Sequence, residues 1–118
     1  MDIRSRKQGR VTVVELEGPM NLHSMRWLSD SLEEWVARAE LNLVFSLADV
    51  TLISSSGLGV LIQFSQSLKQ YNGNLALAAL RQGGKEVMAI TKLDSLFQIF
   101  DTVDEAVQAL EAIQTTND

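Results

Sequence analysis

The chain has 118 residues, with 10 Lys and Arg against 15 Asp and Glu, a formal net charge of -5 and no cysteine. This length suits one domain, and the lack of cysteine excludes disulfides, zinc–thiolate sites and a thiol nucleophile. No apolar run approaches the roughly 20 residues that span a bilayer, and the opening MDIRSRKQGR lacks the apolar core of a secretory signal. We therefore expect one cytoplasmic domain over residues 1–118.

The charge is unevenly spread. Arg4, Arg6, Lys7 and Arg10, with Asp2, leave the first ten residues at +3 and the rest of the chain at -8. A basic stretch can contact nucleic acid, but basic side chains also protect exposed edge strands from pairing with other chains. The acidity of the domain favours an exposed edge strand, without direct nucleic-acid binding.

Apolar spacing predicts alternating strands and helices. In chain order we expect an N-terminal hairpin over 2–16, a helix over 28–39, a buried strand over 41–47, a helix from 57 to about 71 and a strand over 75–80. Next we expect a short helix over 86–92 and a short strand or turn over 96–100. The chain then ends with a last helix, opened by a capping box of Thr102 and Glu105, and a frayed tail over 113–118. This alternation predicts an α/β domain with a mixed, mostly parallel sheet of four or five strands and about four helices.

Three serines stand where a strand gives way to a helix, in TLISSSGLGVLIQF (51–64). One of Ser54, Ser55 and Ser56 is expected to cap that helix. Gly57 and Gly59 each cost a helix about 1 kcal/mol relative to alanine. Two glycines so close to the helix start indicate that something approaches the backbone there.

The helix after the serines has apolar residues on two faces. One face carries Leu58, Leu61, Ile62 and Leu68, and the other carries Val60, Phe64 and Tyr71. Either the second face is an exposed docking surface or the helix is buried on both sides, and the sequence does not separate these alternatives.

Three chemistries could use the serine junction. A phosphate-binding loop would need GxxxxGK[ST] or GxGxxG, which SSSGLG does not match. A serine nucleophile would need a base, and His23 is the only histidine. A serine that receives a phosphoryl group needs only an accessible hydroxyl, and its phosphate would be stabilised by the helix N-terminus.

Three segments together resemble the STAS domain family, and most closely its anti-sigma factor antagonists. LEGPMNLHS (16–24) is similar to the family pattern L-x-G-x-x-D-x-x-[ST]. LVFSLADVTLISSSGLGVLI is similar to D-L-x-x-V-x-x-x-D-S-S-G-L-G-x-L, and ITKLDSLFQIFDTVDEAVQAL resembles the family's closing segment. The resemblance covers nearly the whole chain and implies a single STAS-like domain.

The resemblance implies a partner-switching function. Such a domain captures an anti-sigma factor with serine kinase activity, loses that capture when the kinase phosphorylates one serine, and recovers it through a phosphatase. By position the acceptor is Ser55, with Ser56 and Ser54 as weaker candidates. The expected docking face comprises Asn21, Ser24, Ser54, Ser56, Gly57, Leu58, Gly59, Val60 and Gln63.

The chain departs from the family pattern at two aspartates, which are here Asn21 and Ser54, and Ser46 stands where the family has Asp or Asn. Asn21 and Ser54 keep hydrogen-bonding capacity but lose charge. A non-switching STAS subunit of a transporter or signalling complex is therefore the alternative function. An enzyme or nucleotide-binding protein is disfavoured, and we expect no catalytic residue, metal or cofactor.

Overall fold

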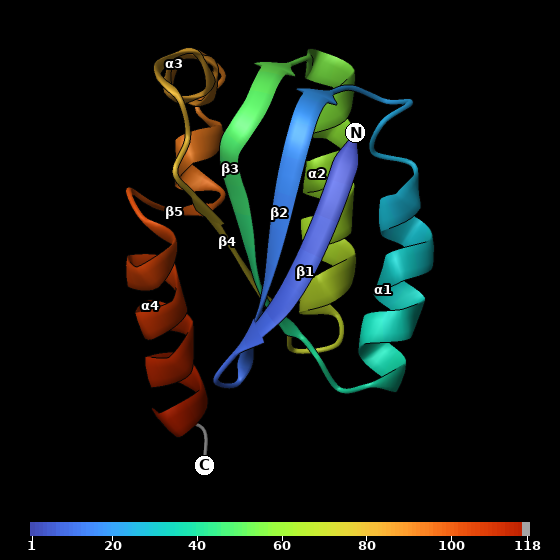
Figure 1. The fold of residues 1–118 in the computed structure, drawn as a ribbon, viewed down its shortest axis with the longest axis vertical. Coiled ribbons are helices and arrows are strands. Elements are labelled where there is room, and N and C mark those ends of the chain that lie inside the picture. The colour runs from blue at the N-terminus through green and yellow to red at the C-terminus, as the bar shows by residue number, and fades with distance from the viewer. Residues whose placement is uncertain (117–118) are drawn as a thin grey trace.

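The computed structural model describes residues 1–116. Within them lie, in order, β1 (Asp2–Gln8), β2 (Val11–Met20), α1 (Trp27–Ala37), β3 (Asn42–Ile53), α2 (Ser55–Lys69), β4 (Asn74–Ala78), α3 (Gln82–Ile90), a 3-10 turn (Leu93–Ser95), β5 (Gln98–Phe100) and α4 (Val103–Thr116) (Figure 1). The predicted order of strands and helices is confirmed.

The five strands form one sheet in the order β1-β2-β3-β4-β5. β1 and β2 are antiparallel, and the other neighbouring pairs are parallel. A tight turn can join only the antiparallel pair, whereas parallel neighbours need a crossover connection. Gly9 takes part in the β1–β2 turn with a φ of 64°, a conformation that suits glycine. The expected mixed, mostly parallel sheet is confirmed.

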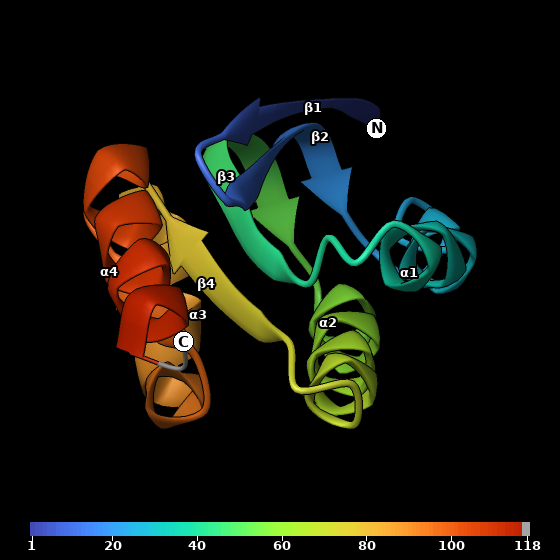
Figure 2. The ribbon, with the colours of Figure 1, turned by 90° about the horizontal axis from the view of Figure 1, so that it is seen from below.

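Helices cover both faces of the sheet. α1 and α2 lie on one face and α4 lies on the other (Figures 1 and 2). This arrangement explains why the run LALAAL (75–80) is apolar at every position. In β4, Leu75 and Leu77 belong to the core beneath α1 and α2, whereas Ala76 and Ala78 belong to the core beneath α4. A run apolar at every position is therefore a strand buried on both faces.

Several boundaries differ from those predicted. β3 continues to Ile53 because it keeps pairing with β2 across two register shifts. α2 begins at Ser55, before Gly57, and α3 covers 82–90 in place of the expected 86–92. Glycines occupy the first turn of both helices and hide their starts from a propensity argument.

The expected frayed tail over 113–118 overlaps the end of the last helix. α4 runs to Thr116, and the partly buried Ile113 packs against the core beneath that helix. Residues 117–118 lie outside the described residues. At the other end of α4 the predicted cap is present, because the Glu105 amide donates to Thr102 Oγ1 at 3.1 Å.

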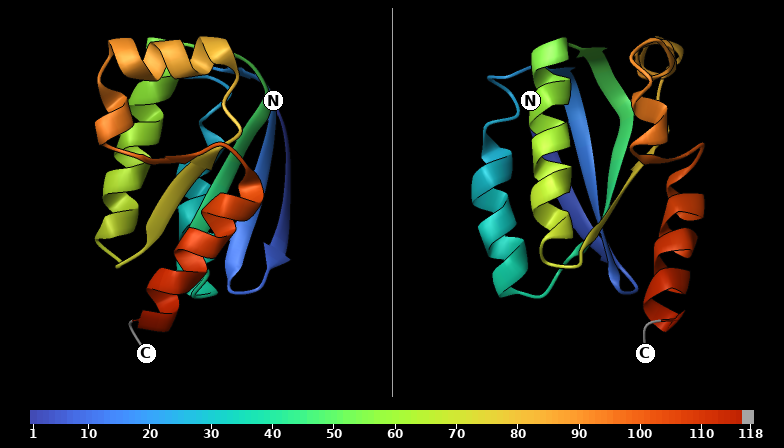
Figure 3. Two further views of the ribbon diagram at one scale, coloured as in Figure 1. Left: turned by 90° about the vertical axis from the view of Figure 1, so that its left-hand side faces the viewer. Right: turned by 180° about the vertical axis from the view of Figure 1, so that it is seen from behind.

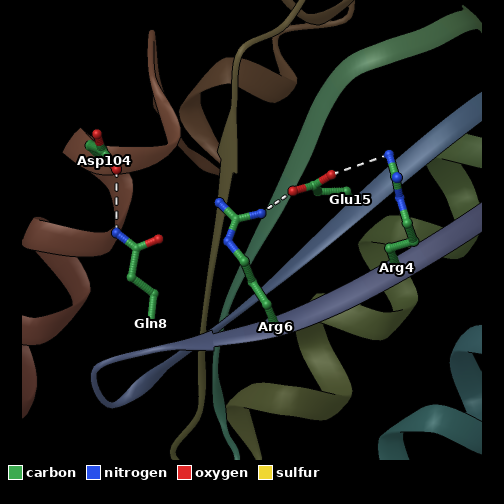
Figure 4. Close-up of polar contacts among 5 residues, drawn as sticks. All are labelled: Arg4, Arg6, Gln8, Glu15 and Asp104. Carbon is green, nitrogen blue, oxygen red and sulfur yellow. Dashed lines mark hydrogen bonds and ion pairs between the residues drawn. The ribbon is translucent and has the colours of Figure 1, made fainter.

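The basic N-terminal segment is the edge strand β1 and pairs largely within the fold. Arg4 and Arg6 both form ion pairs with Glu15 on β2, and Gln8 donates to Asp104 of α4 at 3.3 Å (Figure 4). Two of the four basic side chains thus share one carboxylate, which favours the edge-strand interpretation. Among residues 1–116, no helix has the length and apolarity needed to cross a bilayer.

Candidate functional site

The serine junction lies at the carboxyl end of the sheet. β2 ends at Met20 and β3 ends at Ile53, and these two residues are partners in the parallel register. The chain after β2 forms the loop before α1, whereas the chain after β3 enters α2 directly (Figure 1). The Ser54 amide donates to the Met20 carbonyl at 2.9 Å. Sheet register therefore brings together two segments that are 34 positions apart.

Ser54 is the residue that caps α2. Its Oγ accepts from the Gly57 amide at 3.1 Å and donates to the Met20 carbonyl at 3.2 Å. Ser56 Oγ lies 3.1 Å from Ser54 Oγ and accepts from the Leu22 amide at 3.3 Å. A hydroxyl has one proton, so Ser54 cannot donate to Met20 and to Ser56 at the same time, and either serine can be the donor between the two. The prediction that one serine caps the helix is confirmed.

Ser55 differs from both of its neighbours. It is the first residue of α2 and is exposed. In the part of the chain that the structure describes, its hydroxyl takes part in no hydrogen bond, and the first turn of α2 holds no acidic residue. Ser55 is therefore the serine of the three whose hydroxyl the fold does not use.

Asn21 and Ser24 form a reciprocal pair in the loop between β2 and α1. The Ser24 amide donates to Asn21 Oδ1 at 2.8 Å, and the Asn21 amide donates to Ser24 Oγ at 2.9 Å. Ser24 Oγ also donates to the Pro19 carbonyl at 2.7 Å. Both side chains are half-buried. They hold the loop in shape beside the serines, and neither is a freely exposed polar group.

The two glycines of α2 have different surroundings. A Cβ on Gly57 would lie 2.5 Å from the Met20 carbonyl oxygen, whereas a Cβ on Gly59 would meet nothing within 4 Å. The close approach expected at Gly57 is thus made by this chain's own backbone. Gly59 is exposed and has no such internal reason.

The expected docking face needs correction at Leu58 and at Gly57. Leu58 is one of the expected docking residues, but its side chain is only 3% exposed and belongs to the core beneath α1 and α2. Gly57 is buried as well. Glycines before and after Leu58 have no side chains, so the local apolar pattern does not show which side of this helix turn faces the core. Gly59 and Gln63 are exposed, and Val60 is half-buried.

Two exposed leucines near the serine junction were not among the docking residues predicted from the sequence. Leu22, next to Asn21, is 52% exposed, and Leu52, near the end of β3, is 62% exposed. Leu52 also lines a groove of about 330 Å³ between the end of β3 and α3. A leucine flanked directly by the polar residues Asn21 and His23 in a loop is the signal that could have found Leu22.

Within residues 1–116, no histidine or carboxylate is bonded to a hydroxyl of the three serines. His23 is exposed, and neither it nor Asp49 forms a hydrogen bond or ion pair with the serine junction in the described residues. Within residues 1–116, no three His, Asp or Glu side chains gather as a metal site. The arrangement offers an accessible hydroxyl at a helix N-terminus, and it lacks the partner group that a nucleophile requires.

Residues 2–106 match the model of the STAS domain. The chain belongs to the STAS domain family. A TM1081 homologue in Thermotoga neapolitana is 29% identical over 86 residues, which are 73% of this chain and 74% of that protein. The anti-sigma F factor antagonist of Paenibacillus polymyxa is 24% identical over 104 residues, 87% of this chain and 89% of that protein.

Solved structures share the STAS fold of this chain. TM1081 from Thermotoga maritima superposes with a TM-score of 0.84 at 22% identity, over 92% of this chain and 94% of the other. A sulfate transporter family protein from Wolinella succinogenes gives a TM-score of 0.81 at 16% identity, over 93% and 92%. At these identities the likeness establishes the fold alone.

Proposed function

We propose that this STAS protein is a regulatory binding domain of the anti-sigma factor antagonist type. It captures an anti-sigma factor with serine kinase activity, and phosphorylation of Ser55 ends that capture until a phosphatase removes the phosphate. The observation that carries the proposal is the difference in hydrogen bonding among the three serines. The hydroxyls of Ser54 and Ser56 form hydrogen bonds within the fold, whereas the Ser55 hydroxyl is exposed and forms none in the described residues. The named function of the Paenibacillus polymyxa relative supports the same class.

The surroundings of Ser55 suit a switch that leaves the fold intact. A phosphate adds a charge of about -2 and would lie at the positive end of the α2 dipole, with no acidic side chain in the first turn to repel it. The partner, in contrast, would have to cover that charge together with the exposed side chains of Leu22 and Leu52. Burying an unpaired charge in such a contact is unfavourable, so phosphorylation opposes binding.

Asn21 and Ser54, which stand where the family pattern has aspartates, keep the hydrogen-bonding roles of those positions. Ser54 accepts the Gly57 amide as a capping carboxylate would, and Asn21 Oδ1 accepts the Ser24 amide in the same way. What differs is charge beside the acceptor. We therefore propose that the kinase partner of this chain recognises the loop without those carboxylates.

The domain would act by binding, as a non-enzymatic regulator in the cytoplasm. Its docking face would combine the loop residues Asn21 and Ser24 with Ser56, Gly59, Val60 and Gln63 of α2. Gly59 supports this assignment, because it lowers helix stability and no contact within the described residues requires it. Close approach of a partner's backbone gives this glycine a purpose.

A constitutive subunit of a transporter or signalling complex is the alternative. The absence of carboxylates at Asn21 and Ser54 favours it, and the fold is shared with a sulfate transporter family protein. In that case the same face would bind its partner permanently, and Ser55 would never be modified.

Mass spectrometry of the protein from its native host, across growth conditions, tests the switch directly. We expect a phosphoryl group localised to Ser55. With the partner kinase recovered by pull-down, Ser55→Asp should bind at least about tenfold more weakly, a loss of about 1.4 kcal/mol. Ser55→Ala should bind as the natural protein does.

Ser5→Asp is the matched control, because Ser5 is an exposed serine on β1, remote in the chain from the junction. It should leave binding unchanged, and all variants should melt within a few degrees of the natural protein. If peptides covering the whole chain carry no phosphate and Ser55→Asp binds the partner unchanged, the phosphorylation switch is rejected and the constitutive-subunit alternative is favoured.

A further inference from the structure

A groove runs between α1 and α2 on the outer side of the helical layer. Its volume is about 600 Å³. The two helices lie side by side (Figure 2 and the right view of Figure 3). Leu28, Leu32 and Val36 line it from α1, Val60 and Phe64 line it from α2, and Tyr71 lines it from the turn after α2. The positions on each helix recur every four residues, so each helix contributes one apolar stripe along the groove.

The floor of the groove is rigid. Phe64 stacks on Phe45 of β3 with ring centroids 5.6 Å apart, and it meets Trp35 edge-on at 5.9 Å. Aromatic side chains packed in this way have few alternative rotamers, so binding of a partner would cost little side-chain conformational entropy here. The upper edges are more open, and Tyr71 is 48% exposed. The groove is thus preformed and accessible.

One charge marks the groove. Glu33 is the charged side chain that lines it, is exposed, and forms no ion pair within the described residues. The facing α2 side chains Gln63 and Ser67 are neutral. An occupant with a basic residue opposite Glu33 would be favoured, and one with an acidic residue there would be repelled.

The groove is also continuous with the serine junction at the start of α2. Ser56, Val60, Gln63 and Ser67 follow one another at helical spacing along α2, from the junction into the groove. The lining extends from Leu28 to Ala37 on α1, and from Val60 on α2 to Tyr71 in the turn that follows it. At 1.5 Å per residue this gives about 15 Å, the length of roughly three helical turns.

We propose that this groove binds an amphipathic helix of the partner protein, with an apolar stripe against the groove and a basic residue facing Glu33. The inference deepens the proposed function and rests on it, because the partner that contacts Ser55 would extend along α2 into the groove. Helix-in-groove docking uses apolar anchors at this spacing. The phosphorylated serine would then control one end of a longer interface.

A second copy of this chain fits the groove less well. Glu33 lies near the middle of the α1 stretch that lines it. In a two-fold contact the residues nearest the axis meet their own copies, so Glu33 would face Glu33. Like charges at the centre of an interface oppose such pairing.

Synthetic peptides test the proposal on the full chain. The probes are helix-forming peptides of about 16 residues, long enough to hold helical structure, with leucines at i, i+4 and i+7 or at i, i+3 and i+7. Each is made with lysine or with glutamate at the rim position. Amide chemical shifts of the isotope-labelled protein report where a peptide binds, and a titration gives its Kd.

We expect a lysine peptide to shift the amides of 28–37 and 60–71 and to bind up to about fivefold more tightly than its glutamate twin. Glu33→Lys should reverse that preference. Val36→Lys should weaken binding at least about tenfold, whereas Ile90→Lys, a comparable change at an exposed position of α3, should not affect it. Glu33 is exposed and Val36 lies outside the buried core, so circular dichroism should show both variants folded.

Other outcomes would overturn the groove. These are binding by no peptide, shifts confined to another surface, equal affinity for lysine and glutamate peptides, or a concentration-dependent dimer that shifts the same amides without peptide. The test is separate from that of the switch, because these peptides need no kinase and should bind the Ser55→Asp protein equally well. Loss of the switch with peptide binding intact, or the reverse, identifies which proposal has failed.

Discussion

Gly57 and Gly59 stand two positions apart on α2, and the surroundings of each determine what a side chain would do there. A methyl group on Gly57 would collide with the Met20 carbonyl, whose neighbouring backbone also anchors the loop before α1. A methyl group on Gly59 would point into open space. The first glycine serves the assembly of the junction, and the second is free to serve a partner.

The pair gives a sharp prediction at this scale. Gly57→Ala should lower the free energy of unfolding by about 1–3 kcal/mol, because main chain must move to admit the methyl group. Gly59→Ala should raise it by up to about 1 kcal/mol through helix propensity alone. Urea denaturation of both variants measures the two changes. Equal effects at the two positions would contradict the geometry described for the junction.

At the scale of elements, α4 is the helix that supplies the buried residues packed on its face of the sheet in the described part of the chain. Its inner side consists of Ala106, Val107 and Leu110, which pack on valines and alanines of β2, β3 and β4. The small side chains of β4 leave few other apolar atoms on this face, so the helix depends strongly on Leu110, which is fully buried.

Leu110→Ala should therefore lower the free energy of unfolding by about 2–4 kcal/mol, through lost burial and the cavity left behind. Gln108→Ala, on the exposed side of the same helix, should change it by less than about 0.5 kcal/mol. Chemical denaturation monitored by circular dichroism compares them. A small loss in Leu110→Ala would show that α4 is held by contacts other than its buried face.

At the scale of the molecule, the two cores share the same strands. β3 places Phe45 beneath α1 and α2 and Val44 beneath α4, so neither layer can separate without exposing the opposite face of one sheet. A single domain of this size is expected to unfold in one cooperative step.

Tryptophan fluorescence and circular dichroism can test that cooperativity. Trp27 and Trp35 both lie in the layer of α1, whereas circular dichroism reports all helices, including α4. We expect the two signals to give coincident transitions in urea. A circular dichroism transition that begins at lower urea than the fluorescence transition would show that α4 detaches first.

Local patterns determined the elements of this fold. Apolar spacing, capping residues and the alternation of strand and helix act within a few residues, so they predicted the order of the elements, the mixed parallel sheet and the cap at Thr102. They failed where local signals are weak, at the glycine-rich starts of α2 and α3. Family motifs in the chain likewise pointed to Ser55, although not to the reason for its availability.

Only the tertiary structure decided what each residue of the junction does. Ser54 and Ser56 are engaged because sheet register sets Met20 beside Ile53, a relation between residues 33 positions apart that no local pattern encodes. The burial of Leu58, the exposure of Leu22 and Leu52, and the groove between α1 and α2 likewise depend on how separate elements pack. Sequence specifies which side chains a segment offers, and packing against distant backbone decides which of them remain free to bind.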